Sequence, residues 1–126
     1  MSSKLFEPIG LGGMTLPNRV TVAPMCQYSA NDGSMSDWHL MHLGSMAIAG
    51  AGAVVIEASG VTREGRITHG CVGLYNDDNE AAMKRVVDAC RRVSHSAIGV
   101  QLAHAGRKAS SQVPWSGGNA LKAEQS

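Results

Sequence analysis

A thiol, a carboxamide and a phenol follow one another within residues 23–28 (APMCQY). This segment begins at the end of the β-branched run 19–23. Pro24 ends that run because proline cannot donate a hydrogen bond to a strand ladder. The pattern predicts a strand over 19–23 that opens into a loop carrying chemistry, with Cys26 and Tyr28 as its candidate functional side chains.

Polar side chains also lie at the ends of two further predicted strands. The apolar run 53–58 is bounded by glycines, which predicts a strand buried on both faces, and it brings Glu57 to its carboxyl end. The run 98–102 predicts a third strand, with Gln101 and His104 at its end. The carboxyl ends of parallel strands share one edge of a sheet, and α/β enzymes hold their sites at that edge.

Two helices must join these strands. Apolar residues at helical spacing predict one helix over 38–49, for which Ser36 or Asp37 is a good N-cap. A second helix is predicted to begin at Asp77, where Glu80 three residues on resembles a capping box. The order is therefore β-α-β-α-β, with parallel strands and right-handed crossovers.

This order fits both a TIM (β/α)8 barrel and a doubly wound sheet. No GxGxxG sequence follows the first predicted strand, which favours the barrel. A closed barrel needs about 250 residues, and the 126 residues here supply about three of its eight units. We expect residues 1–126 to be the amino-terminal part of a single barrel domain, with residues 1–18 forming turns or a hairpin, 59–76 a long loop and 109 onward another loop.

Composition and charge narrow the range of partners. The net charge is +1 and the basic residues are scattered, so neither nucleic acid nor an anionic membrane surface is expected to bind. The start of the chain has no apolar targeting segment, and three cysteines at unrelated spacings fit free thiols in a reducing cytosol. His39 and His42 lie three residues apart without a third ligand, so no metal site is predicted.

Five motifs, taken in order along almost the whole chain, closely resemble the old yellow enzyme family. The resemblance is to its cysteine-bearing branch, which includes bacterial xenobiotic reductases and NADPH dehydrogenases. The last motif is the most specific one. The motifs are 24–28 (PMCQY), 31–33 (NDG), 57–59 (EAS), 64–68 (EGRIT) and 101–108 (QLAHAGRK).

The resemblance implies an FMN-dependent ene-reductase built on a TIM barrel. In that family a nicotinamide nucleotide, usually NADPH, reduces the flavin, and hydride then passes from the flavin to an activated alkene such as an α,β-unsaturated carbonyl. We expect the full-length protein to be cytoplasmic and homo-oligomeric. We expect the 126 residues alone to be inactive.

The resemblance also assigns residues. Cys26 would tune the flavin, Gln101 would bind its pyrimidine edge, and Tyr28 would contact the substrate. The family's proton donor would lie in later strands of the barrel. The positions implied to bind the cofactor are Ala23, Pro24, Met25, Cys26, Ala58 and Gln101.

Other interpretations stay open. The chain could be a truncated or partner-dependent fragment without activity, or part of another flavin-dependent barrel such as a dienoyl reductase. Glu57 is expected to form an ion pair with Arg19 or Arg66, while Cys71 and Cys90 are expected to be structural.

Overall fold

An antiparallel hairpin lies near the amino terminus of the protein. The computed structural model describes residues 3–125. Strands β1 (Ile9–Leu11) and β2 (Met14–Leu16) pair antiparallel, and Gly12 takes a left-handed conformation in the turn, with φ 57°. The hairpin predicted for the first 18 residues is therefore confirmed.

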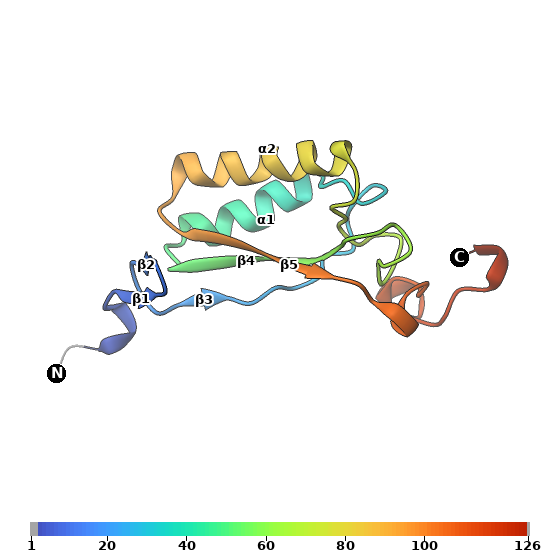
Figure 1. Cartoon of the computed structure of the whole chain (residues 1–126), viewed down its shortest axis with the longest axis horizontal. Helices are drawn as coiled ribbons and strands as arrows, with labels where there is room; N and C mark the ends of the chain where they lie inside the picture. Colours follow the sequence, from blue (N-terminus) through green and yellow to red (C-terminus); the bar gives the residue numbers. More distant parts are fainter. Residues whose placement is uncertain (1–2, 126) are drawn as a thin grey trace.

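Three parallel strands form the main sheet, in the order β3, β4, β5 (Figure 1). They are β3 (Thr21–Val22), β4 (Ala53–Gly60) and β5 (Ala97–Ala103). Strand β3 is shorter than the predicted 19–23. It is an edge strand, and proline at position 24 takes the chain out of the ladder. Strands β4 and β5 each extend beyond their predicted runs.

Helices α1 (Asp37–Ile48) and α2 (Asp77–Val93) connect the strands and lie on the same side of the sheet (Figure 1). Ser36 is the N-cap of α1, as predicted. The N-cap of α2 is Asn76 rather than Asp77, because the Asn76 side chain accepts a hydrogen bond from the Asn79 backbone at 2.8 Å.

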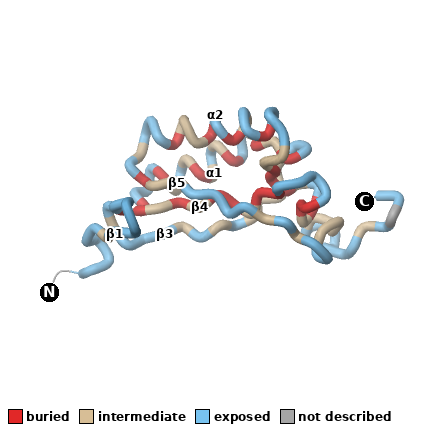
Figure 2. Tube along the Cα trace, viewed as in Figure 1, coloured by how far each residue is buried: buried red, intermediate tan, exposed pale blue. Residues whose placement is uncertain are grey.

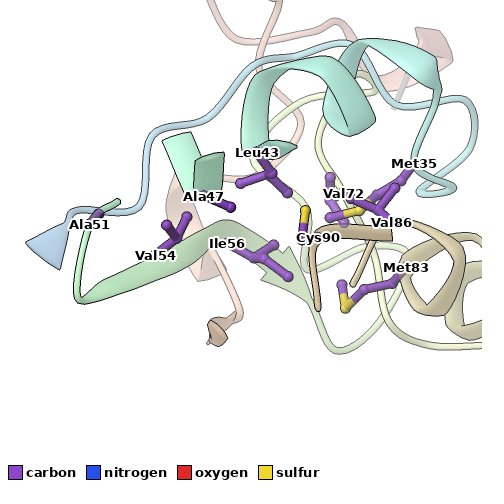
Figure 3. Close-up of a cluster of buried hydrophobic side chains, with 10 residues drawn as sticks. All are labelled: Met35, Leu43, Ala47, Ala51, Val54, Ile56, Val72, Met83, Val86 and Cys90. Carbon is purple, nitrogen blue, oxygen red and sulfur yellow. The ribbon is translucent and has the colours of Figure 1, made fainter. Parts of the chain in front are cut away.

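The hydrophobic core fills the space between these helices and the sheet (Figure 2). Val54 and Ile56 project from β4 into this space with 2% and 1% of their surface exposed, whereas Val55 between them is half-buried. Glu57 and Ser59, further along β4, are buried as well, with 4% and 0% of their surface exposed, although both helices lie on one face of the sheet (Figure 1). The cluster, drawn in Figure 3, consists of Met35, Leu43, Ala47, Ala51, Val54, Ile56, Val72, Met83, Val86 and Cys90.

The segment after β5 was expected to be a loop, but it contains short 3-10 helices over Gly106–Lys108, Pro114–Ser116 and Ala123–Gln125. It is fixed to the loop after β4, because the Ser111 amide donates to the Ile67 carbonyl at 2.9 Å. Across residues 3–125, the helices are too short or too polar to cross a membrane.

Candidate functional site

Three of the predicted site residues meet at the carboxyl ends of β3, β4 and β5. The pairing of β4 with β5 shifts register between Ile56 and Ser59, which leaves Glu57 and Ala58 together opposite Gln101. Cys26 follows β3, and the amide of the next residue, Gln27, donates to the Glu57 carboxylate at 3.1 Å. The expectation from strand order, that these residues share one edge, agrees with this geometry.

The face of the sheet turned away from the helices is open at this edge. Ala23 and Met25 are exposed, and Cys26 is half-buried. Gln101 is exposed as well, and its carboxamide makes no hydrogen bond within residues 3–125. Pro24 lies half-buried between them. The edge therefore combines a soft thiol, small or flexible apolar side chains and a free carboxamide.

Glu57 contacts both the 23–28 segment and the start of α1. The Glu57 carboxylate accepts a hydrogen bond from the Gln27 amide at 3.1 Å, and its other oxygen lies 3.5 Å from Nε2 of His39. Nδ1 of His39 accepts from the Ser36 amide at 3.0 Å, so the ring proton sits on Nε2, which lies near Glu57 but makes no hydrogen bond within residues 3–125. The start of α1 is thereby linked to the loop after β3.

The expected ion pair of Glu57 with Arg19 or Arg66 is wrong, because Glu57 faces His39 inside the protein and Arg66 pairs with Asp32 at 3.3 Å. Burial raises the pKa of Glu57 to about 7, against the opposing effect of the Gln27 amide. Burial also lowers the pKa of His39 to about 4. At neutral pH His39 is therefore uncharged.

Tyr28 lies in a tightly constrained turn beside Cys26. Its backbone is left-handed, with φ 52°, and its ring meets Trp115 edge to face at 5.9 Å. Burial raises the pKa of its phenol. The loop after β4 packs closely here, because a Cβ on Gly70 would lie 2.4 Å from the Tyr28 carbonyl oxygen. The Gly70 carbonyl accepts from the Ala30 amide at 3.0 Å.

Cys71 is the functional candidate that the sequence did not reveal. It was expected to be structural, and it is buried with 1% exposure, but the nearby Cys26 thiol lowers its pKa. The Thr68 hydroxyl lies 3.4 Å from its sulfur. The one available signal was position, since Cys71 follows the carboxyl end of β4 and so belongs to the same edge of the sheet as Cys26.

Residues of the long loop after β4 bind Asp32, which lies in the loop after β3. Its carboxylate lies 3.0 Å from Arg63 and 3.3 Å from Arg66, and the Tyr75 hydroxyl donates to its backbone carbonyl at 2.9 Å. A polar cavity of about 320 Å³ lies between this loop and the C-terminal segment, lined in part by His69. None of the predicted flavin residues lines it. Within residues 3–125, no group of three His, Cys, Asp or Glu side chains could hold a metal ion.

The order and geometry of these motifs match a known family along almost the whole chain. The family model of the NADH:flavin oxidoreductase / NADH oxidase family matches residues 4–119. The chain belongs to this family. Among curated members, an NADH:flavin oxidoreductase of Gibberella zeae is 47% identical over 98% of this chain, and an NADPH dehydrogenase of Bacillus subtilis is 41% identical over 86% of it.

Solved structures of flavin oxidoreductases share the fold. A morphinone reductase complexed with tetrahydroNAD superposes with a TM-score of 0.78 at 31% identity, covering 86% of this chain and 29% of that one. The old yellow enzyme of Trypanosoma cruzi gives 0.74 at 28% identity, covering 84% and 28%. These neighbours are TIM barrels, so both the barrel prediction and the resemblance to old yellow enzymes are confirmed.

The match covers a limited part of each relative. The chain spans 30% of the length of the Gibberella zeae protein and 32% of the Bacillus subtilis protein. The three parallel strands correspond to about three of the eight βα units of a complete barrel.

Proposed function

We propose that these residues form the amino-terminal part of a single FMN-binding barrel domain in an NAD(P)H-dependent ene-reductase. Its substrates would be small activated alkenes such as α,β-unsaturated carbonyl compounds. The observation that carries the proposal is that the loop with Cys26 and the strand ends with Ala58 and Gln101 share the open carboxyl edge of three adjacent parallel strands.

The chemistry of the edge fits a flavin ring. A flat heteroaromatic ring needs an open surface without bulky groups, and Ala23 and Ala58 offer small side chains there. The pyrimidine edge of flavin both donates and accepts hydrogen bonds. The free carboxamide of Gln101 offers the complementary groups, an NH2 donor and a carbonyl acceptor. Pro24 and Met25 would supply apolar contact.

FMN, when bound, would supply hydride transfer, with NADPH or NADH as the source of reducing equivalents. Cys26 would tune the flavin through a weak, uncharged hydrogen bond, because the nearby Cys71 thiol, together with burial, raises the pKa of Cys26 and keeps it protonated. Tyr28 would contact the substrate, and its raised phenol pKa keeps it a hydrogen-bond donor. We assign no proton donor within this chain.

The proposal also covers the cellular location and the partners of the protein. Three free thiols suit a cytoplasmic protein, in which disulfides are rare. We expect the full-length protein to be a homo-oligomer that needs neither nucleic acid nor a membrane. Because these residues supply only one wall of the site, we expect them to be inactive when isolated.

The proposal is tested by purifying the full-length protein and measuring its visible spectrum and its NADPH oxidation with and without 2-cyclohexenone. We expect a yellow protein with bound FMN, and NADPH oxidation that rises when the enone is added. A colourless protein that takes up no added FMN would contradict the proposal. Flavin binding without alkene reduction would reject the ene-reductase activity and retain the cofactor.

A further inference from the structure

Glu57 is a carboxyl group buried towards the carboxyl end of β4, with 4% of its surface exposed. Across residues 3–125, the basic side chain that lies beside it is His39, whose Nε2 is 3.5 Å from Oε2 of Glu57. His39 is uncharged at neutral pH, so it does not offset the cost of burying a carboxyl group. An apolar side chain of similar size would serve stability at least as well. The polar contacts of Glu57 therefore point to a role other than stability.

An irregularity in β4 turns Glu57 towards the helices. Successive residues of a strand face opposite sides, so the residue after the helix-side Ile56 would ordinarily face the open side of the sheet. Between Ile56 and Ser59, however, two residues of β4 stand opposite the single residue Gln101, which is the arrangement of a β-bulge. Glu57 lies instead beside His39 of α1. Bulges redirect side chains in this way and occur often next to active sites.

Glu57 also reaches the loop after β3. Its other carboxyl oxygen, Oε1, accepts a hydrogen bond from the Gln27 backbone amide at 3.1 Å. The side chain of Gln27 is held separately, because Nε1 of Trp38 in α1 donates to its carbonyl oxygen at 3.0 Å. Gln27 stands between Cys26 and Tyr28 in the sequence. A fixed backbone at Gln27 therefore limits where both neighbouring side chains can point.

The backbone of Tyr28 shows that this loop needs support. It is left-handed, with φ 52°, although the residue is not glycine. This conformation costs free energy and persists only where surrounding contacts hold it. The hydrogen bond from Gln27 to Glu57 lies just before the turn. Just after it, the Ser29 carbonyl accepts from the Ser36 hydroxyl at 3.0 Å. The turn is thus held on both sides, and Glu57 holds the side nearer Cys26.

We propose that Glu57 is a positioning residue for the flavin site, whose carboxyl oxygen holds the Gln27 amide and thereby keeps the loop of Cys26 and Tyr28 in the conformation that receives the flavin. The inference rests on the proposed function for its flavin, but the hydrogen bond to the loop can be tested without one. It also gives the bulge in β4 a purpose, since the bulge turns this side chain to where it meets both the loop and α1.

The first measurement is hydrogen–deuterium exchange at pH 6 in the full-length protein without FMN, followed in peptides that span residues 23–28. Burial raises the pKa of Glu57 to about 7, so at this pH its side chain is mostly uncharged and glutamine is a close substitute. Glu57→Gln keeps a carbonyl oxygen for the Gln27 amide and should exchange as the wild type does. Glu57→Met has a similar length but no oxygen, and should accelerate exchange by about tenfold.

The second measurement is the dissociation constant of FMN, titrated into the same apoproteins and followed by flavin fluorescence. A ligand that binds one loop conformation loses affinity as the population of that conformation falls. Glu57→Met should therefore raise the dissociation constant by about three- to tenfold, and Glu57→Gln by less than about twofold. Ile56→Ala removes a core side chain at the neighbouring position and controls for a general loss of stability. It should leave both measurements unchanged within about twofold.

Three outcomes separate the possibilities. If Glu57→Met affects exchange no more than Glu57→Gln or Ile56→Ala does, the proposal is overturned, since the oxygen of Glu57 would not be what holds the loop. Faster exchange in Glu57→Met with an unchanged FMN dissociation constant would also overturn it, because the loop conformation would then not matter to the flavin. If the wild type binds no FMN, the proposed function fails, whereas the exchange measurement still decides whether Glu57 holds the loop.

Discussion

The two faces of the main sheet differ sharply, although both belong to the same short strands. On the helix side, Val54 and Ile56 of β4 are almost completely buried under α1 and α2. On the opposite side, Val55 is only half-buried, and its register partner Gly99 has no side chain to cover it. The face covered by the helices holds the hydrophobic core that stabilises the fold. The open face carries the candidate site at its carboxyl edge.

Substitutions on the two faces of β4 should have very different costs. Ile56→Ala removes a fully buried side chain and is expected to lower the free energy of unfolding by about 2–5 kcal/mol. Val55→Ala should cost clearly less, because its side chain is half-exposed. Urea denaturation followed by circular dichroism measures both. Equal losses would show that the faces do not differ as described.

A similar contrast exists between two glycines. Gly70→Ala places a Cβ 2.4 Å from the Tyr28 carbonyl oxygen and should cost about 1–3 kcal/mol while displacing the loop that carries Cys71. Gly44→Ala, in the middle of α1, meets nothing within 4 Å and should be neutral, or stabilising by up to about 1 kcal/mol. Thermal unfolding compares the two, and the account fails if their effects are similar.

Glu57 contacts both His39 of α1 and the loop after β3. The titration of its carboxyl group should make the free energy of unfolding depend on pH. The pKa of Glu57 is about 7 in the folded protein and 4.5 in the unfolded chain, so its stabilising contribution is complete below pH 4.5 and is lost as the pH rises through 7. The unfolding free energy of the wild type relative to Glu57→Gln should therefore fall between pH 5 and 8, by about 2–3 kcal/mol.

His39 also makes stability depend on pH, because its lowered pKa affects the free energy of unfolding below pH 6.5. This contribution is present in both the wild type and Glu57→Gln, so subtracting one free energy from the other removes it. Unfolding is measured in urea at pH 5 and pH 8. A difference that stays constant with pH would contradict the protonated, buried state of Glu57.

The sequence was sufficient for the order of the elements and for the edge that carries the site. Hydrophobic runs bounded by glycine and proline located β4 and β5, and helical spacing located α1 and α2 within about one residue at their starts. Strand order then placed Cys26 and Gln101 at one edge. These are local signals whose consequence in space follows from parallel topology alone.

The features that the sequence did not predict depend on contacts between segments far apart in the sequence. Nothing in the residues around Glu57 indicates that its partner is His39 rather than an arginine, because the choice depends on how α1 crosses the sheet. The position of Cys71 depends on the close approach of Gly70 to Tyr28.

The central claim is that the open face of the sheet holds one wall of a flavin site, and FMN titration of the full-length apoprotein tests it most directly. Gln101→Ala removes the free carboxamide and should raise the FMN dissociation constant by about tenfold. Val100→Ala, the adjacent residue with its side chain on the other face of β5, should change it by less than about twofold. Equal effects of the two substitutions, or no FMN binding at all, would contradict the account.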